Sequence, residues 1–308
     1  MAEHSRRRVL GGIGAGLAAL AWPGLFGAVA QGMNRSSLPG GERAIPVIGM
    51  GTWRTFNVGS DPELRAARTR VLEAFFEEGG GLIDSSPMYG SSQSALGHGL
   101  EQLGYPESLF TADKVWTRDG DATREQVADS AANWGIERFD LMQVHNLLAW
   151  ESHLETLQAM KQNGELGAVG ITTSHGRRLA EFERIMERHE LDFIQVTYNI
   201  RDRWAEDRIL PLAREKGIAV IANRPYQGGS LIKGLQRRGE SLPGWAEVID
   251  CRTWADFLLR FIVSHPAVTC AIPATTSVEH MRENMAAGRG AMPDASQRQR
   301  MIETLEAV

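Results

Sequence analysis

Residues 62–84 read PELRAARTRVLEAFFEEGGGLID and predict a helix, a stop and a strand in that order. A helical pattern covers Pro62–Glu78, and the glycines Gly79–Gly81 stand where a helix should end before the next strand. The run Gly81–Asp84 is short and apolar up to its last residue, which fits a fully buried parallel strand. We therefore expect one helix-to-strand unit of an α/β fold here.

The same alternation extends along the chain in both directions. Short apolar runs that fit buried strands lie at Ile45–Met50, Gly81–Asp84, Leu109–Lys114, Asp140–His145, Ala168–Thr172, Phe193–Tyr198, Ala219–Ala222 and Thr269–Ile272. Helical patterns lie at Pro62–Glu78, Gln93–Leu103, Thr123–Trp134, His153–Asn163, Arg177–Arg188, Asp207–Glu215, Thr253–Ser264 and Val278–Ala286, with a final helix near Ala295–Ala307. Eight strand–helix units in about 250 residues are typical of a closed (β/α)8 TIM barrel. We predict one such domain over residues 45–308.

A doubly wound open sheet is the alternative α/β architecture. It would need a glycine-rich dinucleotide fingerprint after the first strand, and Gly49-Met50-Gly51-Thr52-Trp53 has the wrong spacing for one. The barrel is therefore favoured. In such barrels the active site lies at the C-terminal ends of the strands, which tells us where to look for functional residues.

The first thirty residues have the pattern of a secretory signal. Ser5-Arg6-Arg7-Arg8 precedes the uncharged run Gly11–Ala30, which closes on Ala28-Val29-Ala30. The paired arginines resemble the twin-arginine export signal, so we expect transient contact with that export machinery, cleavage after Ala30 and a periplasmic protein. The alternative is an uncleaved membrane anchor, because the run is long enough to span a bilayer. Residues 31–44 are expected to be a tether or a small N-terminal cap.

Composition excludes several classes of protein. The net charge is -5 with no basic stripe, which is typical of a protein that does not bind nucleic acid. Cys251 and Cys270 lie far apart and form no CxxC motif, and no HxH or HExxH motif occurs, so no metal site is predicted and a metal-dependent barrel hydrolase is disfavoured. Two separate buried thiols are expected, although pairing of the cysteines and the oligomeric state stay open.

Polar residues follow three successive predicted strands. Asp84 ends the second strand, Lys114 the third and His145 the fourth, and Tyr89 lies in the loop after the second. Each alone is more often a cap, a surface charge or a structural histidine. Together they suggest carbonyl chemistry, because a lysine cation paired with a carboxylate lowers the pKa of a nearby phenol from its usual value of about 10, and an imidazole orients a carbonyl oxygen.

The stretch Asp84-Ser85-Ser86-Pro87-Met88-Tyr89-Gly90, followed by Lys114 and His145 in order, resembles the aldo-keto reductase family over about residues 43–290. The resemblance implies a barrel that binds a nicotinamide cofactor without a Rossmann domain. It implies direct hydride transfer to an aldehyde or ketone, with Tyr89 as general acid. Lys114 and Asp84 would depress the pKa of Tyr89, and His145 would position the carbonyl.

The resemblance also implies a set of cofactor-binding positions. These are Gly51, Thr52, Trp53, Asp84, Thr172, Thr173, Gln195, Asn223, Arg224, Ala274, Thr275, His280, Glu283 and Asn284. Thr173 and Gln195 would hold the carboxamide, Arg224 would meet a phosphate, and Glu283 and Asn284 would bind the adenine. Ala274 and His280 replace the family's usual lysine and arginine. We therefore expect NADPH as cofactor, with a reduced preference over NADH.

Aromatic residues in the loops after the strands suggest an apolar substrate wall. The wall is expected to include Trp53, Tyr89, Trp116 and His145, with Phe56, Trp150, Trp204, Tyr226 and Trp245 as further loop aromatics. An aldehyde or ketone with an apolar or aromatic body is the expected substrate. The alternative function is an exported regulatory or sensor subunit that binds the cofactor with little turnover, because ordinary metabolism does not regenerate NADPH outside the cytoplasm.

Overall fold

The computed structural model describes residues 32–38, 40–41 and 43–308. The predicted signal peptide at residues 1–30 therefore lies outside the described residues and stays a prediction. Within the described part of the chain, no helix is long and apolar enough to cross a membrane.

Eight parallel strands form the predicted barrel, each paired with the next strand along the chain. They are β3 (Met50–Gly51), β4 (Leu82–Asp84), β5 (Phe110–Val115), β6 (Leu141–Val144), β7 (Ala168–Thr172), β8 (Phe193–Thr197), β9 (Ala219–Asn223) and β10 (Cys270–Ala271). The first and last strands meet through a parallel bridge between Ile48 and Ala271, where the Gly49 N–H donates to the Ala271 carbonyl at 2.9 Å. The (β/α)8 prediction is confirmed, and the open-sheet alternative is wrong.

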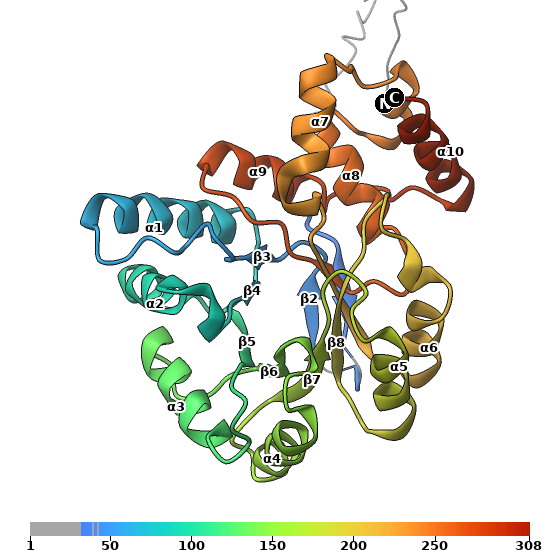
Figure 1. Cartoon of the computed structure of the whole chain (residues 1–308). Helices are drawn as coiled ribbons and strands as arrows, with labels where there is room; N and C mark the ends of the chain where they lie inside the picture. Colours follow the sequence, from blue (N-terminus) through green and yellow to red (C-terminus); the bar gives the residue numbers. More distant parts are fainter. Residues whose placement is uncertain (1–31, 39, 42) are drawn as a thin grey trace, which may run out of the picture. The chain divides into compact units, whose positions relative to one another are not determined.

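Helices surround the strands, and α1 to α6 follow one another around the barrel in chain order (Figure 1). They are α1 (Pro62–Glu77), α2 (Ser92–Leu103), α3 (Thr123–Trp134), α4 (Trp150–Gln162), α5 (Leu179–Arg188), α6 (Ile209–Lys216), α7 (Ser230–Arg238), α8 (Trp254–Val263), α9 (Val278–Ala286) and α10 (Ala295–Glu306). In the opening stretch, Asp61 caps α1 by accepting the N–H groups of Glu63 and Leu64, both at 2.9 Å. Gly79 then takes a φ of 83°, which ends the helix before β4.

Two features differ from the sequence-based expectations. The predicted strand Ile45–Met50 is split: β2 (Ala44–Pro46) pairs antiparallel with β1 (Arg35–Ser37) in the expected tether, and only β3 joins the barrel. Pro46 lacks the N–H that a continuous ladder would need, which is consistent with a break at this position. Sequence analysis does not predict helix α7, which is only 9 residues long and contains Gly234, a residue that lowers helix propensity.

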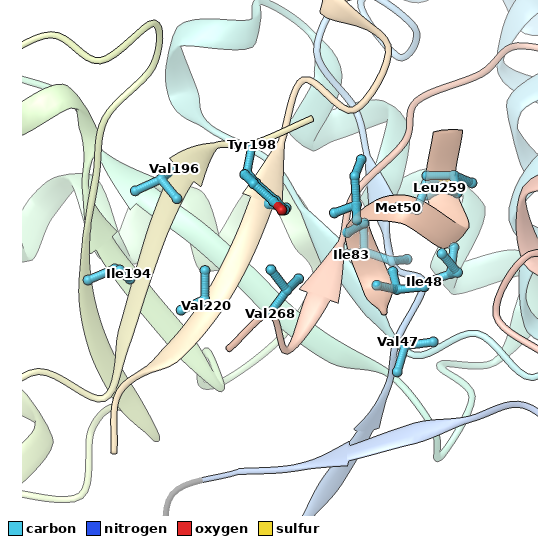
Figure 2. Close-up of a cluster of buried hydrophobic side chains, with 14 of the residues drawn as sticks. Val47, Ile48, Met50, Ile83, Ile194, Val196, Tyr198, Val220, Leu259 and Val268 are labelled. Carbon is cyan, nitrogen blue, oxygen red and sulfur yellow. The ribbon is translucent and has the colours of Figure 1, made fainter. Parts of the chain in front are cut away.

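Strand alternation separates an inner and an outer layer of the barrel. Leu82, Phe110, Ala112, Leu141 and Phe193 belong to a small cluster formed by one side of the strands, which is the barrel interior. The intervening residues belong to the larger cluster between strands and helices. Figure 2 shows part of that outer layer, with side chains from β8, β9, residues 47–50 and α8.

The alternation also positions polar side chains. Every second residue of a strand faces the same side, so the residues that follow the inner apolar positions in this order also face inward. They are Asp84 on β4, Lys114 on β5, Gln143 on β6 and Gln195 on β8. All four point into the barrel near the C-terminal ends of their strands, above the inner apolar cluster. The fold therefore brings these side chains together.

Candidate active site

A buried ion pair lies under the mouth of the barrel. Lys114 Nζ contacts Asp84 Oδ2 at 2.6 Å and donates to the Ser85 carbonyl at 2.6 Å, and the Lys114 side chain is 0 % exposed. The other Asp84 oxygen accepts Gln195 Nε2 at 2.7 Å and Gln143 Nε2 at 3.3 Å. Burial is the largest single effect and lowers the pKa of Lys114, but the charge and hydrogen bond of Asp84, together with Tyr89 and Asp113, outweigh it. The net pKa is therefore raised, and the lysine stays charged.

Tyr89 lies directly over this ion pair. It ends the short 3-10 turn Pro87–Tyr89, and Lys114 Nζ is 5.3 Å from the centroid of its ring. Burial raises the pKa of the phenol to about 12, and the Lys114 charge lowers it only in part. The expectation that Lys114 and Asp84 together depress this pKa is therefore wrong for Asp84, because the carboxylate charge disfavours a phenolate and raises it.

His145 forms the third side of the site. Its ring meets the Tyr89 ring edge to face, with centroids 5.8 Å apart and an interplanar angle of 87°. Its Nδ1 lies 2.9 Å from Ser86 Oγ. Burial, with a smaller effect from the Lys114 charge, lowers the pKa of His145 to about 3. The imidazole is therefore neutral at physiological pH.

A cavity of about 440 Å³ opens above these residues. Eleven predicted site residues line it: Gly51, Thr52, Trp53, Asp84, Tyr89, His145, Thr172, Gln195, Asn223, Arg224 and Ala274. Lys114 lies behind Asp84 and Tyr89 and does not line the cavity wall. Inside the cavity, Asn223 Nδ2 donates to Gln195 Oε1 at 3.3 Å, so a pair of amides lies beside Asp84.

Several predicted cofactor residues lie away from the cavity lining. The Thr173 hydroxyl donates to the Arg177 carbonyl at 2.7 Å, so it is already engaged in a local turn. Asn284 Oδ1 accepts the Tyr226 hydroxyl at 2.7 Å. Thr275 Oγ1 accepts the Ser277 N–H at 3.1 Å, just before α9. His280 is exposed and Glu283 is half-buried on α9.

The aromatic wall is smaller than expected. Trp53, Tyr89 and Tyr226 line the cavity, together with Met88, which is 41 % exposed. The other loop aromatics are used elsewhere. Trp116 is 43 % exposed and not part of the lining, and Phe56 is in the core. The indole of Trp150 donates to Glu181. Trp204 packs beside Gly176, and Trp245 packs on Phe257.

Two arginines flank Trp53 at the cavity. The guanidinium carbon of Arg54 lies 4.1 Å from the centroid of the Trp53 ring, and that of Arg224 lies 5.8 Å away. Neither guanidinium forms an ion pair with a described residue. Their φ angles are 64° and 52°, a region that non-glycine residues rarely adopt, and such strain is common at functional sites.

Sequence reasoning missed several polar residues of the site, including Arg54 in the cavity lining, Gln143 and Ser86. Gln143 was not singled out, although a glutamine two residues before His145 in an apolar strand points to the same barrel face. Its Oε1 is the one buried side-chain oxygen or nitrogen in the described chain that lacks a hydrogen-bond partner. Ser86 was quoted within a motif without a role. Its contact with His145 depends on the tertiary structure and leaves no sequence signal.

Cys251 and Cys270 are both free and buried, as two separate thiols. The described residues contain no group of three or more His, Cys, Asp or Glu side chains arranged to hold a metal ion.

Known proteins share both the sequence pattern and the fold. The NADH-specific methylglyoxal reductase of Escherichia coli is 27 % identical over an alignment that covers 84 % of this chain and 95 % of that protein. A second methylglyoxal reductase of Escherichia coli is 26 % identical and covers 80 % of this chain and 86 % of its own length. The structure of an aldo-keto reductase from Klebsiella pneumoniae in complex with NADPH superposes with a TM-score of 0.73, at 21 % identity, over 89 % of this chain and 95 % of that one.

The family model supports the same assignment. The model described as "Aldo/keto reductase family" matches residues 47–300, which include the ion pair, Tyr89, His145 and the segment before α9. The chain belongs to the aldo/keto reductase family.

Proposed function

We propose that this chain reduces a small aldehyde or ketone to an alcohol with a reduced nicotinamide dinucleotide, and that Tyr89 donates the proton. Membership of an oxidoreductase family supports the reaction class. The observation that carries the assignment is the arrangement of Tyr89 and His145 at one cavity, directly above the buried Lys114–Asp84 ion pair.

The site residues divide the chemistry among them. When bound, the nicotinamide supplies the hydride. His145, held neutral, donates a hydrogen bond that orients the carbonyl oxygen, and Tyr89 gives its proton to that oxygen. The raised pKa of Tyr89 keeps the phenol protonated in the resting enzyme. Lys114 stabilises the phenolate left behind, and Asp84 keeps Lys114 charged in the barrel interior.

The lining of the cavity fits a dinucleotide. Arg54 and Arg224 present charges that no described carboxylate neutralises, which suits a diphosphate. Gly228 and Gly229 also line the cavity, and a Cβ at Gly229 would meet no protein atom within 4 Å. Gln195 and Asn223 offer amides for the carboxamide of the nicotinamide.

Both cofactor forms are expected to bind, with a modest preference for NADPH. The segment before α9 carries Ala274 and an exposed His280, without a lysine or arginine at either position. The first turn of α9 still favours an anion, by about 0.3–1 kcal/mol. A relative whose name specifies NADH supports use of the second cofactor.

Small carbonyl compounds are the proposed substrate class. Two relatives are named as methylglyoxal reductases, which supports a short 2-oxoaldehyde as a first candidate. Met88, Trp53, Tyr226 and Ile272 provide an apolar lining beside the polar floor. A larger aromatic aldehyde is the second candidate, since the rim at Met88 is open to solvent.

Steady-state turnover tests this function. Purified protein would be mixed with NADPH or NADH and methylglyoxal, benzaldehyde or simple ketones, while oxidation of the cofactor is followed by absorbance. Turnover that disappears in Tyr89→Phe supports the proposal. Cofactor binding by calorimetry without turnover on any compound would instead favour a regulatory or sensor subunit.

We also propose that residues 1–30 direct export to the periplasm. The pair Arg6–Arg7 before an apolar run that ends in Ala28-Val29-Ala30 supports a twin-arginine signal. Replacing both arginines by lysine keeps the charge but removes the guanidinium pair, so the periplasmic yield should fall. An unchanged yield would exclude this route, and an intact mass that begins at Met1 would exclude cleavage after Ala30.

A further inference from the structure

Ser86 connects the two groups that meet the carbonyl in the proposed function. Its side chain accepts the Met88 N–H at 3.2 Å, and its carbonyl accepts the Tyr89 N–H at 2.9 Å, so it caps the turn that carries Tyr89. The same hydroxyl lies 2.9 Å from His145 Nδ1. Ser86 is 0 % exposed, so water does not compete for these contacts.

Hydrogen-bond accounting fixes the direction of the Ser86–His145 bond. A serine hydroxyl has one hydrogen to donate and two lone pairs to accept with. Met88 N–H already uses one lone pair, and His145 Nδ1 is the remaining partner of the hydroxyl among the described residues. If Nδ1 were protonated, the Ser86 hydrogen would be buried without an acceptor, which is costly. Ser86 therefore donates to an unprotonated Nδ1.

The other ring nitrogen then carries the proton of the neutral imidazole. His145 lines the cavity, and no described residue bonds its Nε2. With the proton on Nε2, the ring presents a donor to a carbonyl oxygen. With the proton on Nδ1, it would present a lone pair to that oxygen and repel it.

We propose that Ser86 is a positioning residue that fixes His145 in the tautomer protonated at Nε2 and fixes the turn that presents Tyr89. This inference rests on the proposed function for its catalytic consequence. The tautomer itself is a property of the protein without substrate and can be measured independently of turnover.

Nitrogen NMR tests the tautomer directly. Protein labelled with 15N-histidine would be recorded at pH 7, and the His145 signals assigned by their loss in His145→Gln. In the wild type, Nε2 should have the shift of a protonated nitrogen and Nδ1 that of an unprotonated one. In Ser86→Ala, Nδ1 loses its donor, so the two shifts should move toward each other as both tautomers become populated.

Ser85→Ala is the matched control for the NMR experiment. Ser85 is equally buried and lies in the same loop, but its hydroxyl contacts Thr52 and Ser92 at 3.0 and 3.2 Å rather than His145. Removing it should leave the His145 shifts as in the wild type.

Kinetics test the consequence for catalysis. Ser86→Ala should lower kcat about fivefold to tenfold, the effect of one hydrogen bond, and leave the Kd for NADPH unchanged. Ser86→Thr keeps the hydroxyl and should recover most of kcat together with the wild-type shifts. If Ser86→Ala does not fold, Ser86→Cys replaces it, because a thiol is a weak donor of similar size.

Two results would overturn the proposal. One is a wild-type His145 protonated at Nδ1. The other is a Ser86→Ala variant whose His145 shifts are unchanged. If the shifts respond as expected but no carbonyl compound is turned over by the wild type, then the proposed function fails while the tautomer assignment stands.

Discussion

Two regions of the chain are expected to meet the same cofactor, yet they differ in burial. In the catalytic region, Asp84 and Lys114 have side chains that are 3 % and 0 % exposed, and both Asp84 oxygens are bonded. In the adenosine segment, residues 274–284, Ala274 and His280 are exposed. The first region carries the residues on which the resemblance rests, whereas Ala274 and His280 in the second stand where that resemblance implies a lysine and an arginine.

Burial explains this difference. A charge in the barrel interior must be paired, and removal of one partner of a buried pair costs about 3–5 kcal/mol. An exposed contact is worth about 1 kcal/mol or less, because water takes its place. Substitution at the exposed positions Ala274 and His280 should therefore cost little, and substitution in the catalytic region should cost more.

The largest effect is expected at Tyr89. Tyr89→Phe removes the proton donor and little packing, so kcat should fall about 10²–10⁴-fold. The Kd for NADPH, measured by calorimetry, should stay the same. A variant that keeps most of its kcat would show that another group supplies the proton. The catalytic region would then tolerate substitution as well as the adenosine segment does.

Lys114 tests the cost of burial. Lys114→Met leaves Asp84 charged and unpaired in the barrel interior, so the free energy of unfolding, measured with urea, should fall by about 3–5 kcal/mol. Adding Asp84→Asn should recover much of this stability without restoring activity. Lys161→Met is the control, because Lys161 pairs with Asp192 at the surface and its loss should cost about 1 kcal/mol or less. If Lys114→Met and Lys161→Met lose the same free energy of unfolding, then burial does not make the first ion pair more costly to break than the second.

His145 makes the catalytic region sensitive to acid. Burial holds the folded pKa at about 3, below the unfolded value of about 6.5, so between these values the unfolded chain binds a proton that the folded protein does not. Stability is complete above pH 6.5 and falls as the pH decreases. The loss from this group should be about 2 kcal/mol at pH 5. The free energy of unfolding would be measured with urea at pH 7 and pH 5. The decrease between the two pH values should be smaller in His145→Gln than in the wild type by about 2 kcal/mol. An equal decrease in both proteins would contradict the burial argument.

The smallest effect is expected at His280. His280→Ala should weaken NADPH binding about twofold to fivefold, because an exposed contact to the 2′-phosphate is worth about 1 kcal/mol or less. NADH binding should not change. Calorimetric Kd values for both cofactors would measure this. A loss of NADPH affinity above tenfold would mean that the adenosine segment holds a dedicated phosphate site despite its exposure.

Much of the catalytic region could be predicted because its signals are local. Strand alternation and the order of the strands are enough to place Asp84, Lys114 and His145 at one mouth of the barrel. The side-chain partners could not be predicted in this way. Whether Thr173 faces a ligand or the Arg177 carbonyl depends on a turn that its sequence does not specify.

The direction in which the pKa of Tyr89 is shifted could not be predicted from the sequence either. It depends on the balance between burial and the Lys114 charge, and only the packed structure sets that balance. Helix α7 was missed for a different reason: it has only 9 residues with Gly234 in its interior, and short helices depend on the packing of a buried residue such as Leu235.

The two guanidinium groups beside Trp53 have an optical consequence. A ligand that draws Arg54 and Arg224 toward its phosphates takes both cations away from the indole ring and changes its electrostatic surroundings. The emission of Trp53 should therefore respond to phosphate groups even when no nicotinamide ring is present. Inorganic diphosphate would then alter the fluorescence of the wild type but not that of Trp53→Phe, which makes this residue a reporter of occupancy that needs no label.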